Sequence, residues 1–177
     1  MYRINELLKL DRKLFHTRDL ALLWNIRDDN TLYTQIKRYV DKGILLPIHK
    51  GFYATVPLET IDPLELGINA LHRYAYVSCE FILAKEGVIF QHSPLITLVS
   101  SVSRNFTLTT YQYHVRMLNN RYLYNDCGIE SAGNYRKASI ERSVADLLYF
   151  NPRFHIDNRE GINWKKVATI RKEVGYR

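Results

Sequence analysis

The stretch NTLYTQIKRYVDKGILLPIHKGFYA, residues 30–54, decides the fold of the first part of the chain. Apolar side chains recur in its first half at the spacing of one helix face, at Leu32, Ile36, Tyr39 and Val40. The helix is expected to end at Gly43, because glycine is the residue type that most often follows a helix C-terminus. Two short apolar runs, 44–48 and 52–56, are joined by the basic turn 49–51, and together they predict a β-hairpin.

The opposite face of this predicted helix is polar. It gathers amide, hydroxyl and charged side chains: Asn30, Thr34, Lys37, Arg38 and Asp41, with Thr31 and Tyr33 on its flanks. Asn30 is the expected N-cap. Two more helices are expected upstream. One covers residues 2–10, where Ile4, Leu7 and Leu8 have helical spacing, and the other covers residues 17–26 with Thr17 as its cap.

Helix, helix, polar turn, helix and basic hairpin is the element order of a winged helix-turn-helix, which we predict for residues 1–56. In that arrangement the third helix enters the DNA major groove and the hairpin lies along the flanking backbone. DNA contacts are therefore expected from eight residues: Thr17, Arg18, Thr31, Thr34, Lys37, Arg38, His49 and Lys50. Arg38 would pair with guanine, and Thr34 would touch a thymine methyl group. The backbone amides at 17–18 and the hairpin would hold phosphates or probe the minor groove.

The basic charge of the chain gathers at its two ends. Residues 1–54 hold 10 Lys and Arg against 6 Asp and Glu, and residues 151–177 hold 7 against 3, so each end carries +4. Residues 55–150 hold 8 against 9, which leaves the middle at −1. Basic ends favour a polyanionic partner such as nucleic acid, although a solvated basic surface gives the same pattern. A winged module that recognises only proteins stays open as an alternative.

Composition gives no sign of a membrane or secreted protein. Apolar residues make up 46% of the 177 residues, yet no apolar run reaches the roughly 18 residues that a membrane helix needs. Residues 1–13 lack the apolar region of a signal peptide. Cys79 and Cys127 have no metal-binding spacing and are expected to be reduced thiols, with one disulfide as the alternative. We expect a cytoplasmic protein.

A mixed helix–sheet domain is predicted for residues 60–177, which makes the whole chain α+β. Expected helices begin at caps Asp62, Ser78 and Ser139, and a last amphipathic helix covers 163–174. Expected strands are a continuous apolar one at 94–101, one long alternating run at 105–118, and two weaker ones at 122–126 and 134–139.

No known catalytic or cofactor motif occurs in the sequence. Phosphate-binding glycine loops, the HExxH zinc motif and the GxSxG nucleophile motif are all missing, and the six His residues are scattered. We therefore expect no metal, no cofactor and no enzyme activity. The enzyme alternative would need Glu80, Glu141 and Asp146 to meet in space, with metal-dependent action on nucleic acid.

Four short blocks resemble one family. They are Tyr76-Val77-Ser78, Gly87-Val88-Ile89, the segment ITLVS at 96–100, and the segment ASIERSVAD at 138–146. In this order, behind the predicted winged domain, they resemble the AbiEi-type antitoxins, the regulators of bacterial abortive-infection (type IV toxin–antitoxin) systems. One departure is Glu86, which stands where the family pattern has His before the glycine.

The resemblance implies a DNA-binding protein that represses its own operon at inverted repeats. It also implies that the second domain counteracts a nucleotidyltransferase-like toxin encoded beside it. A stand-alone transcription factor without a toxin partner remains the alternative to this reading.

Overall fold

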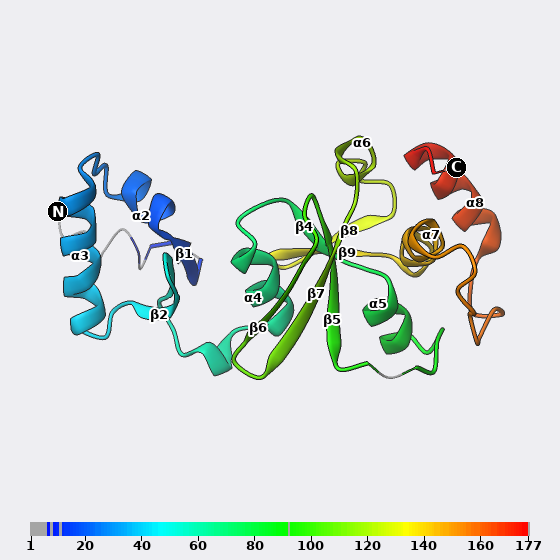
Figure 1. Cartoon of the computed structure of the whole chain (residues 1–177), viewed down its shortest axis with the longest axis horizontal. Helices are drawn as coiled ribbons and strands as arrows, with labels where there is room; N and C mark the ends of the chain where they lie inside the picture. The colour runs from blue at the N-terminus through cyan, green and yellow to red at the C-terminus, as the bar shows by residue number, and fades with distance from the viewer. Residues whose placement is uncertain (1–6, 8, 11, 92, 177) are drawn as a thin grey trace. The chain divides into compact units, whose positions relative to one another are not determined.

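The computed structural model describes residues 7, 9, 10, 12–91 and 93–176. The chain contains both helices and strands, and the strands form two separate sheets, which agrees with the predicted α+β class (Figure 1). The chain forms two compact units, Met1–His72 and Arg73–Arg177. The helix that starts after Asp62 therefore belongs to the first unit, whereas the sequence placed the domain boundary between residues 56 and 60.

The first unit contains a small three-stranded sheet with the order β1-β3-β2, in which both strand pairs are antiparallel. Its elements are β1 (Leu14–His16), α2 (Thr17–Leu23), α3 (Asp29–Asp41), β2 (Leu46–His49), β3 (Phe52–Ala54), the 3₁₀ turn η1 (Leu58–Thr60) and α4 (Pro63–Ala70). The helix predicted over residues 2–10 lies mostly outside the described residues. Strand β1 was not predicted, because its three residues, of which only Leu14 and Phe15 are apolar, are too few to show a period.

Helix α3 has the predicted inner face. Leu32, Ile36 and Tyr39 are buried in one core with residues of α2, while Val40 is half-buried. The cap is Asp28 and not Asn30, because the Asp28 carboxylate accepts a hydrogen bond from Thr31 N at 2.7 Å. Helix α2 likewise begins one residue earlier than predicted, with His16 as N-cap and Thr17 inside the helix.

The predicted hairpin is confirmed as β2 and β3. Gly51 has a φ of +78° in the turn, a value that glycine adopts without strain. Phe52 and Ala54 are fully buried, and β3 pairs with β1 on its other side. The hairpin is thus attached to the segment that leads into α2.

The second unit is built on a six-stranded sheet with the order β6-β7-β5-β4-β9-β8. Parallel pairs are β5 with β7 and β4 with β9, and the other neighbours are antiparallel. Its elements are β4 (Ala75–Val77), α5 (Glu80–Lys85), β5 (Leu95–Ser100), β6 (Arg104–Leu108), β7 (Tyr111–Met117), α6 (Asn120–Leu123), β8 (Ile129–Ala132), β9 (Tyr135–Ala138), α7 (Ile140–Phe150) and α8 (Trp164–Val174).

Three predictions in this unit were wrong. The run at 105–118 is a hairpin, because Thr109 takes a φ of +53° and turns the chain between β6 and β7. The strand predicted at 122–126 is replaced by α6, a four-residue helix capped by Asn119. Ser78 does not cap α5, because its hydroxyl donates to Asp146 and Cys79 occupies the cap position.

Helices α5, α7 and α8 share one core with the sheet. Helix α7 packs against both α5 and α8, and Val144, Leu147 and Ile170 are among the buried residues (Figure 1). Helix α8 is amphipathic, as predicted, with Val167, Ile170 and Val174 buried. Across the described part of the chain, no helix has the length and apolar character required to cross a membrane.

Candidate functional site

The outer face of α3 holds four of the eight predicted DNA contacts. Thr31, Thr34, Lys37 and Arg38 are all exposed, opposite the buried face of the helix. Among the described residues, neither Lys37 nor Arg38 forms an ion pair with an acidic side chain. Both cations are therefore available to an external anion or to a hydrogen-bond acceptor.

Thr34 makes a local hydrogen bond that limits how it can act. Its hydroxyl donates to Asn30 O at 2.7 Å, one helical turn earlier. The hydroxyl hydrogen is thus engaged, while the oxygen lone pairs and the methyl group remain exposed. Thr34 is suited to accepting a hydrogen bond or making an apolar contact, as with a thymine methyl group.

The other four predicted residues lie at the start of α2 and in the hairpin. Arg18, His49 and Lys50 are exposed. Thr17 is half-buried, and its backbone N–H donates to Gly51 O at 2.9 Å. This amide is already occupied, so it does not offer the phosphate site predicted for it. Instead it ties α2 to the hairpin turn.

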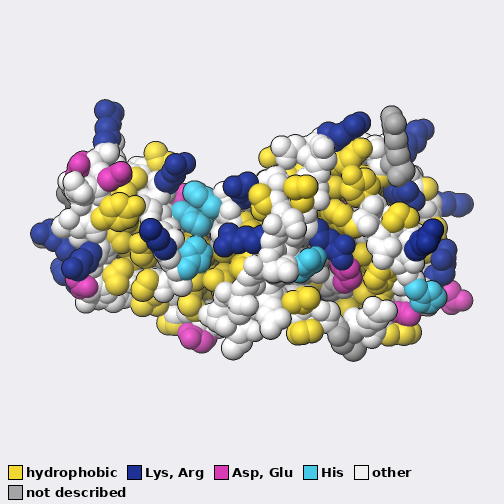
Figure 2. Space-filling view, in the orientation of Figure 1, with side chains coloured by type: hydrophobic (Ala, Val, Ile, Leu, Met, Phe, Trp, Pro, Cys, Tyr) yellow, Lys and Arg dark blue, Asp and Glu magenta, His cyan; other side chains and the backbone are white. Residues whose placement is uncertain are grey.

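Acidic residues flank the cations of α3. Asp28 and Asp29 lie at its N-terminus and Asp41 ends it. The hydrogen bonds that Asp28 accepts from Thr31 lower the pKa of Asp28, so this carboxylate stays charged. Figure 2 shows the same mixture, with acidic side chains among the Lys and Arg side chains over the first unit at the left. An approaching phosphate would therefore be attracted to the middle of α3 and not to its N-terminus.

A column of aromatic rings runs beside the hairpin. The buried His16 ring stacks between Phe52, at a centroid distance of 4.4 Å, and His72, at 3.9 Å. The His49 ring is tilted against Phe52, with the two ring centroids 5.2 Å apart. Because a carbonyl can only accept, His16 Nε2–H donates to Asn69 O at 2.7 Å. Burial lowers the pKa of His16, and the hydrogen bond to Asn69 opposes this only in part.

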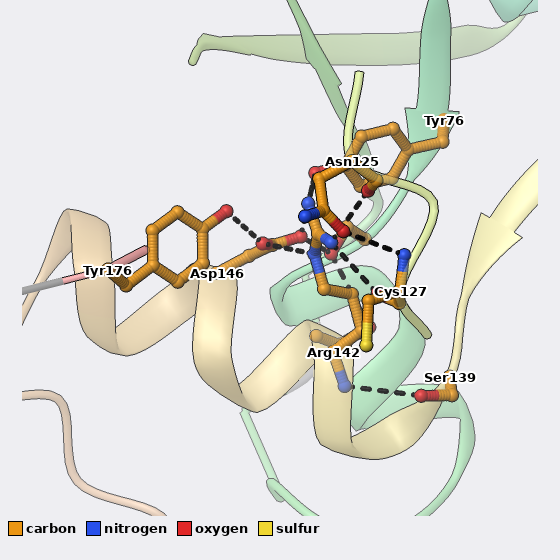
Figure 3. A network of polar contacts seen from close by, with 9 residues as sticks. Tyr76, Asn125, Cys127, Ser139, Arg142, Asp146 and Tyr176 are labelled. Carbon is orange, nitrogen blue, oxygen red and sulfur yellow. Dashed lines mark hydrogen bonds and ion pairs between the residues drawn. The ribbon is translucent and has the colours of Figure 1, made fainter. Parts of the chain in front are cut away.

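The second unit contains a buried polar network centred on Arg142 and Asp146 (Figure 3). Both side chains are 0% exposed, and Arg142 Nε donates to Asp146 Oδ1 at 2.8 Å. Arg142 also donates to three other groups: Asn125 O at 3.0 Å, Cys127 O at 2.9 Å and the Tyr76 hydroxyl at 3.0 Å. The network thus joins α7 to β4 and to the loop before β8.

Asp146 has its accepting capacity filled by this network. Besides Arg142, it accepts from Tyr76 at 3.0 Å, Ser78 at 2.8 Å and Tyr176 at 2.5 Å. A carboxylate has about four lone-pair sites, so none is left for a substrate or a transferred proton. The arrangement is that of a structural ion pair, which must be fully hydrogen-bonded to be tolerated in a core.

The pKa values of the surrounding groups follow from this enclosure. Burial and the adjacent Asp146 carboxylate raise the pKa of Tyr76 and of Tyr176, so both hydroxyls stay protonated and donate. Burial alone would lower the pKa of Arg142, but Asp146 and the Tyr76 hydroxyl raise it above its ordinary value. Arg142 therefore keeps its charge in the core.

The three carboxylates of the enzyme alternative have different cationic partners. Glu80 pairs with Arg116, Glu141 lies 3.1 Å from Lys166, and Asp146 pairs with Arg142. Within the ranges that the structure describes, no group of three or more His, Cys, Asp or Glu side chains is placed to hold a metal ion. Both cysteines are free.

A cavity of about 250 Å³ lies beside the start of α7 and is lined by both Glu141 and Lys166. Glu130 of β8 and Lys137 of β9 also line the cavity, and they are opposite each other in the register of the two strands. The Lys166 charge is paired with Glu141, and the carboxylates of Glu86 and Glu130 line the same cavity, so there is little net attraction for an anion. The cavity gives no indication of a particular ligand.

The network was not predicted, although one signal for it was visible. Arg142 and Asp146 are four positions apart on a helix, the spacing of an ion pair. Ser143 lies between them, and all three polar side chains stand in a mostly apolar helix sequence. Their partners Tyr76 and Tyr176 are about 70 and 30 positions away in the chain, a separation that no local pattern can bridge.

A comparison with models of known protein families gave no match, and a comparison with curated proteins gave none.

Proposed function

We propose that the chain is a DNA-binding transcriptional regulator and that its first unit is a winged helix-turn-helix. In this proposal α3 is the recognition helix and the β2–β3 hairpin is the wing. The proposal rests mainly on the exposed face of α3. There Lys37 and Arg38 lie beside Thr31 and Thr34 and have no acidic partner among the described residues. The exposed His49 and Lys50 of the hairpin support it.

The proposal assigns different roles to α3 and to the hairpin. Arg38 has the planar, two-pronged donor group that pairs with the O6 and N7 atoms of guanine. Lys50 carries a single exposed charge in a turn, which suits a phosphate. Base contacts determine which sequence is bound, whereas phosphate contacts strengthen binding to every sequence alike.

Single alanine variants test this division. Arg38→Ala should lose about 1–3 kcal/mol on the operator and less on random duplex, because it removes a base contact. Lys50→Ala should weaken both duplexes equally and reduce the salt slope by about 1. The measurement is fluorescence anisotropy titration of both duplexes at several salt concentrations.

Lys85→Ala is the matched control, because it removes an exposed cation from α5 of the second unit. It should bind both duplexes like the unmodified chain. Equal losses from all three variants would contradict a site on α3 and would point to a general charge effect.

The resemblance to the AbiEi-type antitoxins extends the proposal to autoregulation and to a toxin partner. Residues of two family blocks, Tyr76 and Ser78 in one and Arg142 and Asp146 in the other, meet in the buried network. This supports a shared domain core, but buried residues cannot recognise a partner.

The toxin therefore needs a test of its own, in which co-expression of this chain restores growth arrested by a neighbouring nucleotidyltransferase-like protein. Growth that is not restored, or the lack of such a neighbour, would leave a stand-alone regulator.

Protein recognition by the first unit is the second candidate. Two apolar side chains of its helices favour it, Leu22 of α2 with 81% of its surface exposed and Tyr33 of α3 with 56%. Tyrosine is enriched at protein interfaces, and an exposed leucine beside it would add apolar contact area. A DNA affinity that does not change with salt would favour this candidate, because phosphate binding must release counterions.

A further inference from the structure

Strand β6 forms one edge of the six-stranded sheet. It pairs with β7 on one side, in an unbroken register from Arg104 opposite Val115 to Leu108 opposite Tyr111 (Figure 1). Among the described residues, no strand pairs with its other side. Arg104, Asn105 and Thr107 are exposed. A free edge of this kind presents unpaired backbone groups to any strand that can align with it.

The usual features that protect a sheet edge are missing from β6. It has no proline, no bulge and no lysine, and its single charge, Arg104, is at its first residue. The opposite edge strand, β8, is shorter and has the carboxylate of Glu130 near its centre. Of the two edges of this sheet, β6 is therefore the better suited to pairing.

The sequence RNFTL of β6 is complementary to itself in the antiparallel direction. Centred on Phe106, the pairing sets Arg104 opposite Leu108 and Asn105 opposite Thr107, so no like charges meet. Phe106 would face Phe106 of the second copy, and aromatic cross-strand pairs stabilise sheets. Phe106 is already fixed by stacking on Tyr113, with ring centroids 4.8 Å apart.

We propose that β6 pairs antiparallel with β6 of a second copy of this chain, in the register centred on Phe106, to form a dimer. Such a pair has two-fold symmetry and closes after two subunits, whereas β6 on β8 would continue as an open chain of subunits. The two six-stranded sheets become one continuous sheet. The inference does not rest on DNA binding, although a two-fold dimer is what an inverted-repeat operator requires.

Charge exchange at the edge tests the dimer. Asn105→Lys/Thr107→Lys places Lys opposite Lys twice in the proposed register, and Asn105→Glu/Thr107→Glu does the same with Glu. Each double variant alone should be monomeric, and an equal mixture of the two should restore the dimer. Both positions are exposed, and the Asn105 changes remove only a surface hydrogen bond with His114, so we expect the subunit fold to be retained. Thr110→Lys, in the exposed turn beyond β6, is the control and should remain dimeric.

Cysteine cross-linking tests the register. Asn105→Cys and Thr107→Cys chains should form an interchain disulfide when mixed and should not when oxidised separately, because residue 105 faces residue 107 of the other copy and neither position faces itself. The bridge is identified by peptide mapping without reduction, which separates it from Cys79 and Cys127.

Sedimentation equilibrium of the unmodified chain and of the mixtures gives the decisive masses. A dimer that both double variants lose and their mixture regains is the expected result. A monomer at every concentration, or a dimer that both double variants keep, would overturn the proposal. Salt-dependent DNA binding by that monomer would leave the proposed function intact, so the two failures are distinguishable.

Discussion

Asp146 and Arg142 show how a single pair of residues can hold several elements together. Both are fully buried and hydrogen-bonded to β4, to the loop before β8 and to Tyr176 beyond α8. Bringing two charges into a core costs free energy that only a complete set of partners offsets. Removing one partner therefore costs much more than the net contribution of the pair.

Asp146→Asn should lower the free energy of unfolding by about 3–5 kcal/mol, because it leaves the Arg142 charge buried without its counter-ion. Asp126→Asn is the matched control, since Asp126 pairs with Arg136 at the surface with 63% of its side chain exposed. That change should cost less than about 1 kcal/mol. Urea unfolding measures both. Similar losses from the two variants would contradict the structural role of the buried pair.

Gly128 is the residue against which the Arg142 side chain packs. Its φ is +75°, and a Cβ added there would lie 2.8 Å from Arg142 Cβ. Gly128→Ala should therefore destabilise the fold by more than the roughly 1 kcal/mol of backbone strain alone. Gly133→Ala isolates that strain, because Gly133 has a φ of +63° with no atom within 4 Å of the added Cβ. Equal thermal shifts for the two variants would show that the close contact has no cost.

At the scale of elements, the regular helices and the apolar strand were predictable, as were the caps Asp62 and Ser139. The caps of α2, α3 and α5 were predicted wrongly. The inner faces of α3, α7 and α8 follow from a period of 3.6 residues over eleven residues or more. Caps moved by one or two residues because Asp28 and Asn30 are both good cap residues and only one carboxylate reaches the helix amides. Helix α6 has four residues, too few for any period to register.

The candidate site, too, was predictable from the sequence only where it depends on local periodicity. The exposed face of α3 could be predicted, because it is the complement of an apolar stripe. The engagement of the Thr17 amide by Gly51 could not be, because it depends on how the hairpin folds back on α2. The Arg142–Asp146 network could be suspected from its spacing on α7, while its remote partners could not.

The ring column joins β1, the hairpin and the end of α4, and it makes these contacts sensitive to pH. The His16 pKa is lowered in the fold, so the unfolded chain binds more protons as the pH falls through about 6.5. Stability should therefore be fully present above that pH and decline below it. His72, His49 and Asp19 face the same ring, and the two histidines reinforce the effect while Asp19 opposes it.

His16→Phe should flatten the fall in unfolding free energy between pH 7.5 and pH 5, because it removes the group that gains the proton. His155→Gln is the control, since the His155 side chain is 82% exposed. Its profile should match that of the unmodified chain. Parallel profiles for His16→Phe and the unmodified chain would contradict the linkage.

At the scale of the whole molecule, the two units differ in the kind of surface that they offer to a partner. The first presents exposed cations on a helix and a hairpin that have no acidic partner within the part of the chain that the structure describes, a pattern that favours a polyanionic partner. The second holds the buried Arg142–Asp146 network, and among the described residues no strand pairs with the outer side of β6. Our proposals accordingly assign DNA recognition to the first unit, and self-association and the toxin partner to the second.

The most direct test of DNA recognition is binding of the unmodified chain to the duplex upstream of its own gene and to random duplex, at about 50 and 200 mM salt. We expect a preference of about 1000-fold or more for the upstream duplex, with an affinity for both that falls steeply as salt rises. No binding at either salt concentration, or an affinity that does not change with salt, would contradict the account and assign the first unit to protein recognition.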